Sequence, residues 1–116
     1  MGNYFKLVVW QKSKNLAVKI YHLTGDKDIS MDFGLRDQLR RAAISIPSNI
    51  AEGDELGSDK QSVRHFYIAK GSTAELITQL IISNEIGYFR QEIVDPLIGE
   101  CKIISTMLMK IIKARS

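Results

Sequence analysis

The sequence predicts an all-α fold, an up-and-down four-helix bundle, with residues 1–116 forming a single domain. Three observations predict it. Apolar residues recur every three or four positions, the period of an amphipathic helix. Only eight glycines and two prolines interrupt 116 residues. No two alternating β-branched runs are joined by a short Asn-Gly or Asp-Gly turn, so strand signals are weak.

The first two helices are predicted at residues 8–23 and 33–52. The first has an apolar stripe and stops at Thr24-Gly25. Its stripe comprises Val9, Leu16, Ile20 and Leu23, and that of the second helix Leu35, Leu39, Ala42, Ile46 and Ile50. Pro47 leaves the Ala43 carbonyl without its usual partner, which predicts a kink in the second helix. Residues 53–57 are expected to form a loop, and residues 52–59 a solvated acidic surface.

The third and fourth helices are predicted at residues 58–86 and 91–113. Ser58 is a typical N-cap, with Gln61 three residues later in a capping-box pattern. The third stripe comprises Phe66, Ala69, Thr73, Leu76, Leu80 and Ile81, and the fourth Ile93, Leu97, Cys101, Ile104, Leu108 and Ile111. Gly71, beside Ser72 and Ala74, predicts the close approach of another helix.

The apolar stripes of the last two helices are wider than a helix buried on one side needs. The fourth helix carries Ile103-Ile104, Met107-Leu108-Met109 and Ile111-Ile112. Because a monomer of this size would leave part of that surface in water, the pattern predicts self-association.

Motifs for metal binding and catalysis are not found. The residues three positions before His22 and His65 are Lys19 and Ser62, so neither histidine belongs to a Glu-x-x-His di-iron motif. Residues 26–37 have Met31 where a calcium loop needs glycine, and residues 53–60 lack the Gly-Lys-Ser/Thr of a phosphate-binding loop. Cys101 is expected to be a buried, small apolar residue. We therefore expect no enzyme activity, catalytic residues, metal, cofactor or small-molecule substrate.

The location expected from the sequence is the cytoplasm. One cysteine cannot form an internal disulfide, which suits a reducing compartment. The longest uncharged apolar stretches, such as residues 76–84, are too short to span a membrane, and residues 1–12 show no signal-peptide pattern.

Charge leaves a nucleic-acid partner open. The net charge is +3, and two clusters of cations stand out, the lysines of the first helix and the arginines that open the second. Candidate phosphate-binding residues are Lys12, Lys19, Arg36, Arg40 and Arg41. The alternative is a solvated face in which Asp37 pairs with Arg40 or Arg41. Trp10 is expected to pack into the core and not to stack on bases.

The stretch QLRRAAISIPSNIAEG, Gln38 to Gly53, resembles the signature of the bacterial four-helix bundle proteins first noticed as reading frames in intervening sequences of 23S rRNA genes. Three further pieces match in order: VVWQKSKNLAVKIY from Val8, FGL at Phe33, and IAKGSTAEL followed by TQL, Ile68 to Leu80. Ile77 departs from the pattern, since an acidic residue is common there, and the Phe-Pro that follows the first helix in the family is missing.

The resemblance implies a bundle that assembles into a ring, typically a homopentamer, in a family whose activity is mostly unknown. A related branch, the accessory proteins of diversity-generating retroelements, binds nucleic acid and a reverse transcriptase through a basic pentameric barrel. The signature falls on Arg40, Arg41, Ser45, Pro47, Ser48, Asn49, Glu52, Gly71 and Glu75. The arginine pair has two interpretations, phosphate contacts or structural pairing with Glu52 or Glu75.

The leading hypothesis is a non-enzymatic, self-assembling helical bundle that binds RNA or DNA through repeated weak phosphate contacts. The competing hypothesis is a protein-interaction scaffold that presents a ring to a partner without binding nucleic acid. A regulatory or toxin–antitoxin-like role is a third, weaker alternative.

Overall fold

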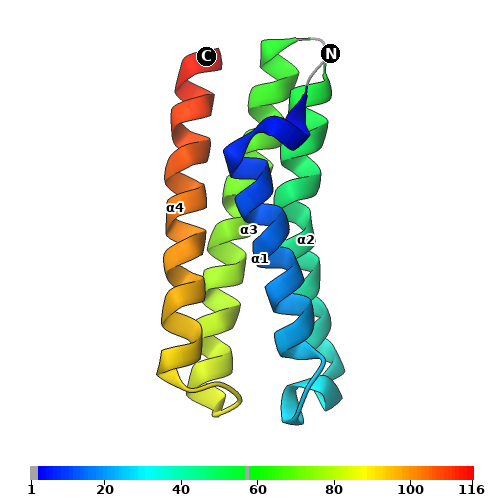
Figure 1. The fold of residues 1–116 in the computed structure, drawn as a ribbon, viewed down its shortest axis with the longest axis vertical. Helices are drawn as coiled ribbons and strands as arrows, with labels where there is room; N and C mark the ends of the chain where they lie inside the picture. The colour runs from blue at the N-terminus through cyan, green and yellow to red at the C-terminus, as the bar shows by residue number, and fades with distance from the viewer. Residues whose placement is uncertain (1–2, 57) are drawn as a thin grey trace.

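A computed structural model of the protein describes residues 3–56 and 58–116. These residues form four long helices, α1 (Val8–Thr24), α2 (Phe33–Glu55), α3 (Asp59–Ile86) and α4 (Gln91–Arg115). Two short 3₁₀ helices, η1 (Tyr4–Lys6) and η2 (Asp28–Met31), precede α1 and α2. The helices alternate in direction along an elongated bundle of 44 × 20 × 20 Å, with the start of α1 and the end of α4 at the same end of the bundle (Figure 1). The predicted four-helix bundle is confirmed.

The ends of the helices follow local chemistry. Ser58 accepts a hydrogen bond from the backbone N–H of Gln61 at 3.3 Å, so the predicted N-cap of α3 is present. Asp32 caps α2 in the same way, through a bond from the Leu35 N–H at 3.1 Å. Gly87, with φ of +101°, ends α3 in the left-handed conformation that glycine adopts at no steric cost.

The core follows the predicted stripes except at the edges of two helices. Phe66, Leu76, Leu80, Cys101 and Leu108 are fully buried. Two predicted core residues are wrong: Ile81 is 42% exposed and Ile93 is 40% exposed. In α4 the buried stripe begins with Val94 and ends with Ile112, because these residues continue the three-and-four spacing through Leu97 and Leu108.

The junction of α2 and α3 corrects two expectations. Gly53 does not open a loop, because α2 continues to Glu55 and Gly53 lies buried inside it. A side chain at Gly53 would place its Cβ 2.8 Å from Cε1 of Phe66, so the close packing of α3 requires glycine there. The acidic stretch is not wholly solvated either, since the side chain of Asp54 is only 8% exposed and accepts a 3.0 Å ion-paired hydrogen bond from Arg115 Nη2.

Candidate nucleic-acid interface

The signature segment of α2 presents three different faces, as its helical period requires. Ile46, Ile50 and Gly53 point into the core. Ile44, Pro47, Ser48 and Ala51 line a groove against α1. Ser45, Asn49 and Glu52 contact polar side chains of α3. One segment therefore serves the core and two further contact surfaces.

The face toward α3 forms a chain of hydrogen bonds, which we call the α2–α3 seam. Ser72 Oγ of α3 donates to Ser45 Oγ at 2.8 Å, and Asn49 Nδ2 donates to the Ser45 carbonyl at 2.9 Å. His65 Nδ1 lies 3.0 Å from Asn49 Oδ1 and 3.2 Å from Glu52 Oε2. Because both neighbours accept, Nδ1 carries the proton. These signature residues hold two helices together.

Arg41 extends the seam by one turn. Its Nη2 donates to Glu75 Oε2 at 2.7 Å and to Gln38 Oε1 at 2.9 Å. Both members of the Arg41–Glu75 pair are about half exposed, so the pair contributes little to stability by itself. Of the two acidic partners considered for the arginines, Glu75 is therefore the one that meets Arg41, while Glu52 meets His65 instead.

Arg40 holds the end of α1 to α2. Its Nε donates to Thr24 Oγ1 at 2.8 Å, and its Nη2 donates to the Tyr21 carbonyl at 3.3 Å. The guanidinium also lies 4.5 Å from the centroid of the Tyr21 ring. A cation at a helix C-terminus is favoured by the helix dipole. The position of Arg40 is thus accounted for by contacts inside the chain.

The remaining candidate cations do not gather on one surface. Arg36 donates to Asp37 Oδ1 at 3.0 Å and to the Ser30 carbonyl at 3.1 Å. Lys19 pairs with Glu100 of α4 at 3.1 Å. Lys12 also lies beside α4, where Glu100, Ile103 and Ile104 line the same small cavity, but it is in no salt bridge among the described residues. The five candidates are therefore divided among four places in the fold: two beside α4, and one each at η2, at the end of α1 and beside α3.

A different group of lysines does come together, which we call the lysine surface. It comprises Lys12, Lys102, Lys110 and the partly exposed Ile103, Thr106 and Met107. Lys102, Thr106 and Lys110 recur at i, i+4 and i+8 on α4 and border a shallow depression of about 330 Å³. Within residues 3–56 and 58–116, no carboxylate lies within 4.0 Å of Lys12, Lys102 or Lys110.

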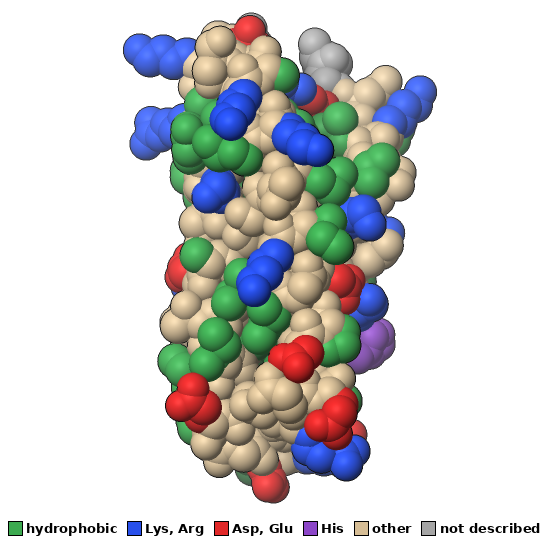
Figure 2. Space-filling view, turned by 90° about the vertical axis from the view of Figure 1, so that its left-hand side faces the viewer, with side chains coloured by type: hydrophobic (Ala, Val, Ile, Leu, Met, Phe, Trp, Pro, Cys, Tyr) green, Lys and Arg blue, Asp and Glu red, His purple; other side chains and the backbone are tan. Residues whose placement is uncertain are grey.

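The charge on this side of the molecule is polarised along the bundle. Glu92, Asp95 and Glu100 lie in the first half of α4, whereas its cations, Lys102, Lys110, Lys113 and Arg115, follow. Figure 2, which faces α4, shows most blue side chains in its upper half and most red ones in its lower half. This surface was not identified from the sequence because only the cations of the first two helices were considered; the eight-residue spacing of Lys102 and Lys110 was the available signal.

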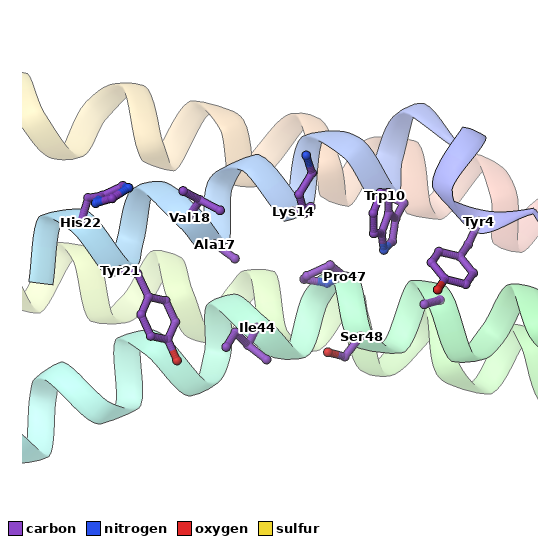
Figure 3. Close-up of a pocket in the computed structure, with 11 residues that line it drawn as sticks. Tyr4, Trp10, Lys14, Ala17, Val18, Tyr21, His22, Ile44, Pro47 and Ser48 are labelled. Atoms are coloured by element: carbon purple, nitrogen blue, oxygen red, sulfur yellow. The ribbon is translucent and has the colours of Figure 1, made fainter.

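The second surface is an apolar groove between α1 and α2, with a volume of about 620 Å³ (Figure 3). We call it the α1–α2 groove. Trp10, Val18 and Tyr21 line it from α1, and Ile44 and Pro47 line it from α2. Trp10, expected in the core, packs against the core only partly and also lines this groove. Pro47 therefore has two effects: its ring adds apolar surface to the groove, and its lack of an N–H removes one backbone hydrogen bond from α2.

Gly71 does not have the role expected of it inside the chain. No atom of another residue lies within 4 Å of the place where its side chain would begin, and the residue is exposed on α3. The close helix approach predicted at this position is absent among the described residues of one chain, because Gly71 faces outward while Ser72 and Thr73 face the neighbouring helices.

The described residues contain no group of three or more His, Cys, Asp or Glu side chains that could hold a metal ion. Burial raises the pKa of Cys101 to about 12, so this side chain stays a thiol, as expected of a buried apolar residue. In residues 3–56 and 58–116, no helix has the combination of length and hydropathy that a membrane span requires.

The fold and these surfaces define a four-helix bundle protein whose signature residues are used for helix packing and for an outer groove. The chain belongs to the 23S rRNA-intervening sequence protein family, whose profile matches residues 5–110. The resemblance seen in the sequence is thereby confirmed.

Among solved structures, the chain is similar to a protein of unknown function of the S23 ribosomal protein family from Bacteroides thetaiotaomicron VPI-5482. The two share 26% identity with a TM-score of 0.84, over 91% of this chain and 99% of that one. No curated protein matches this chain.

Proposed function

We propose that this protein is a non-enzymatic, self-associating helical bundle that binds RNA through the lysine surface. The observation that carries the proposal is the grouping of Lys12, Lys102 and Lys110 around the exposed Ile103, with none of the three in a salt bridge among the described residues. Cations without a partner neutralise phosphates at little cost, and each contact releases a counterion from the nucleic acid. A reducing cytoplasm suits the single buried thiol.

The proposal changes the set of phosphate-binding residues. Arg40 and Arg41 are assigned structural roles, because their donors are used on Thr24, Tyr21 and Glu75. Lys19 and Arg36 already pair with carboxylates. Of the five cations singled out by sequence, only Lys12 keeps the assignment to nucleic acid.

Self-association completes the proposal, with a homopentameric ring as the expected form. Large apolar side chains remain exposed on α3, among them Tyr67 at 50% and Ile82 at 44%. Burying such side chains between copies removes apolar surface from water. Five copies of a chain with net charge +3 would carry about +15 in total, and repetition would add avidity to weak sites.

The test is a fluorescence-anisotropy titration of nuclease-treated protein with structured RNA, and with duplex DNA for comparison, at about 50 to 200 mM salt. Wild-type binding is expected to weaken by orders of magnitude over this range. The Lys102→Gln/Lys110→Gln variant should bind more weakly, with a salt slope shallower by about one to two.

The matched control is Lys27→Gln/Arg90→Gln, which removes two cations at the other end of the bundle. It lowers the net charge by the same two units as Lys102→Gln/Lys110→Gln. Comparing the RNA affinities of the two variants therefore distinguishes the loss of a local contact from a general loss of positive charge. Equal weakening in both variants, or none in the first, would overturn the assignment to the lysine surface.

A second candidate function is a protein-interaction scaffold, which the exposed apolar groove between α1 and α2 favours. It is the conclusion to draw if neither RNA nor DNA binds at about 50 mM salt. The scaffold function would also be supported if the purified protein carries no nucleic acid, as judged from its ratio of absorbance at 260 and 280 nm, and another protein co-purifies with it.

A further inference from the structure

One face of α3 carries an exposed, uncharged stripe that could pack between two helices of another molecule. Tyr67, Gly71, Ala74 and Thr78 follow one another at three- and four-residue spacing, and all are exposed. We call these four residues the α3 ridge. None is charged, and Ile82 continues the line. At Gly71 the helix backbone itself is the surface, because no described residue outside the adjoining turns of α3 lies within 4 Å of a Cβ built there. Small residues allow a partner to approach closely.

The α1–α2 groove matches this ridge in character and in length. Along α1 the groove extends from Trp10 to Tyr21, and along α3 the ridge extends from Tyr67 to Thr78. Each distance is eleven helical steps, or about 17 Å. The groove is apolar and open along its length, with Val18 49% and Ile44 43% exposed. Both surfaces therefore leave apolar area in water that the other could cover.

The charges at the two ends select the direction of pairing. Glu55 lies one turn after Ala51, beyond the Trp10 end of the groove, and Arg40 lies at the Tyr21 end, while Lys14 lines the groove between these two ends. On α3 the order of signs is reversed, with Arg64 beyond Tyr67 and Glu85 beyond Thr78.

The end of α2 and the start of α3 lie at the same end of the bundle, so two copies side by side in the same orientation bring opposite charges together. The inverted orientation would place Arg64 near Arg40 and Glu85 near Glu55, which is unfavourable.

We propose that the α3 ridge of one copy docks in the α1–α2 groove of a second copy that has the same axial direction. The inference rests on the proposed self-association and names its surfaces. Groove and ridge are different surfaces of one chain, so the contact is head-to-tail, and repetition closes a ring when the rotation between copies permits. Gly71, which is exposed and meets no other helix among the described residues of its own chain, then has the close helix approach that its residue type predicts.

The experiment uses one variant on each surface and measures mass by sedimentation velocity or light scattering. Gly71→Gln adds a long polar side chain to the ridge and keeps a partner helix at a distance, and Ile44→Gln places a polar amide in the apolar groove. The matched controls are Gly99→Gln, another glycine without a neighbour within 4 Å, and Ile93→Gln, whose 40% exposure is close to the 43% of Ile44. We expect monomers with unchanged helical circular dichroism from the first two, and wild-type mass from the controls.

Mixing tests the head-to-tail geometry. Gly71→Gln retains a groove and Ile44→Gln retains a ridge, so an equimolar mixture should form a species of twice the monomer mass that neither variant forms alone. A mixture that stays monomeric would overturn the head-to-tail contact. If both variants keep the wild-type oligomer mass, the choice of surfaces is wrong while self-association stands. A wild-type protein that is monomeric at all concentrations would overturn both.

Discussion

The hydroxyl of Tyr88 donates a 2.8 Å hydrogen bond to Oδ2 of Asp32, joining two connections that are 56 residues apart in sequence. Asp32 is the N-cap of α2, and Tyr88 lies in the turn between α3 and α4. The same carboxylate therefore caps one helix and holds the adjacent turn at one end of the bundle. The backbone N–H of Leu35, followed by the Tyr88 hydroxyl, holds the pKa of Asp32 below its usual value.

This pair predicts how stability changes with pH. A lowered folded-state pKa of Asp32 contributes stability that is present above its unfolded value of about 4 and is lost as the pH falls through the folded value. The hydrogen bond to Asp32 raises the pKa of Tyr88, so its contribution is complete below about pH 10 and is lost as the pH rises further. Asp32→Asn should flatten the acid limb of the unfolding free energy, and Tyr88→Phe the alkaline limb.

Urea unfolding at a series of pH values measures both limbs. Glu92→Gln removes an exposed carboxyl in the first turn of α4 and serves as the control, with a wild-type profile expected. An acid limb unchanged in Asp32→Asn would contradict the assignment of this carboxylate.

Arg40 is expected to stabilise the bundle more than Arg36 does. Arg40→Gln removes donors from the buried Thr24 hydroxyl and the Tyr21 carbonyl, which should cost about 1–2 kcal/mol of unfolding free energy. Arg36→Gln breaks a pair with the exposed Asp37 and a hydrogen bond to the Ser30 carbonyl of η2, neither of which joins two long helices, so it should cost less, about 0.5 kcal/mol. Chemical denaturation of both variants gives the comparison, and equal losses would refute the role of Arg40.

Gly53 and Gly71 should respond in opposite ways to alanine. Gly53→Ala forces a Cβ to within 2.8 Å of Phe66 and 3.1 Å of the Ser62 carbonyl, so we expect a loss of about 1–3 kcal/mol. Gly71→Ala meets no atom within 4 Å, and removing glycine from a helix should stabilise the fold by about 0.5–1 kcal/mol. The change in stability is measured by thermal unfolding of each variant and of the wild type, at a protein concentration where all three have the same oligomeric state. The packing argument fails if Gly53→Ala unfolds no earlier than wild type.

Cys101 should be unreactive while the protein is folded. Its pKa of about 12 leaves almost no thiolate near pH 8, and the residue is buried. Labelling with an aromatic disulfide reagent should follow the urea unfolding curve. A Cys101→Ala/Ser116→Cys variant places the thiol at an exposed position and should react at once in the native state. Rapid labelling of the native wild-type protein would contradict this prediction, because it would show that local opening of the core beside α4 exposes Cys101 without global unfolding.

The positions of the helices could be predicted because they depend on neighbours in sequence. Apolar spacing, the Ser58 cap and the glycine after Thr24 act within one or two turns, so α1 begins and ends within a residue of its predicted range of 8–23. Gly53 was misjudged, since glycine is a usual loop signal and only the Phe66 ring requires it inside α2.

The partners of the charged residues could not be predicted in the same way. Arg41 meets Glu75 across 34 residues, Arg115 meets Asp54 across 61, and Lys19 meets Glu100 across 81. Each pair depends on which helices are neighbours and on how each is rotated about its axis. That rotation also decides that Lys12 joins Lys102 and Lys110, while Lys19 is neutralised by Glu100.

The sequence by itself determined four amphipathic helices, their order and the residues of the signature segment, because the helical period is a local property of the chain. Only the tertiary structure decided what those residues do: which cations are paired, which glycine is enclosed, and that the signature lines both the α2–α3 seam and the α1–α2 groove. The reason is physical. Pairing, burial and exposure depend on distances between helices, and these are set only when the four stripes pack together.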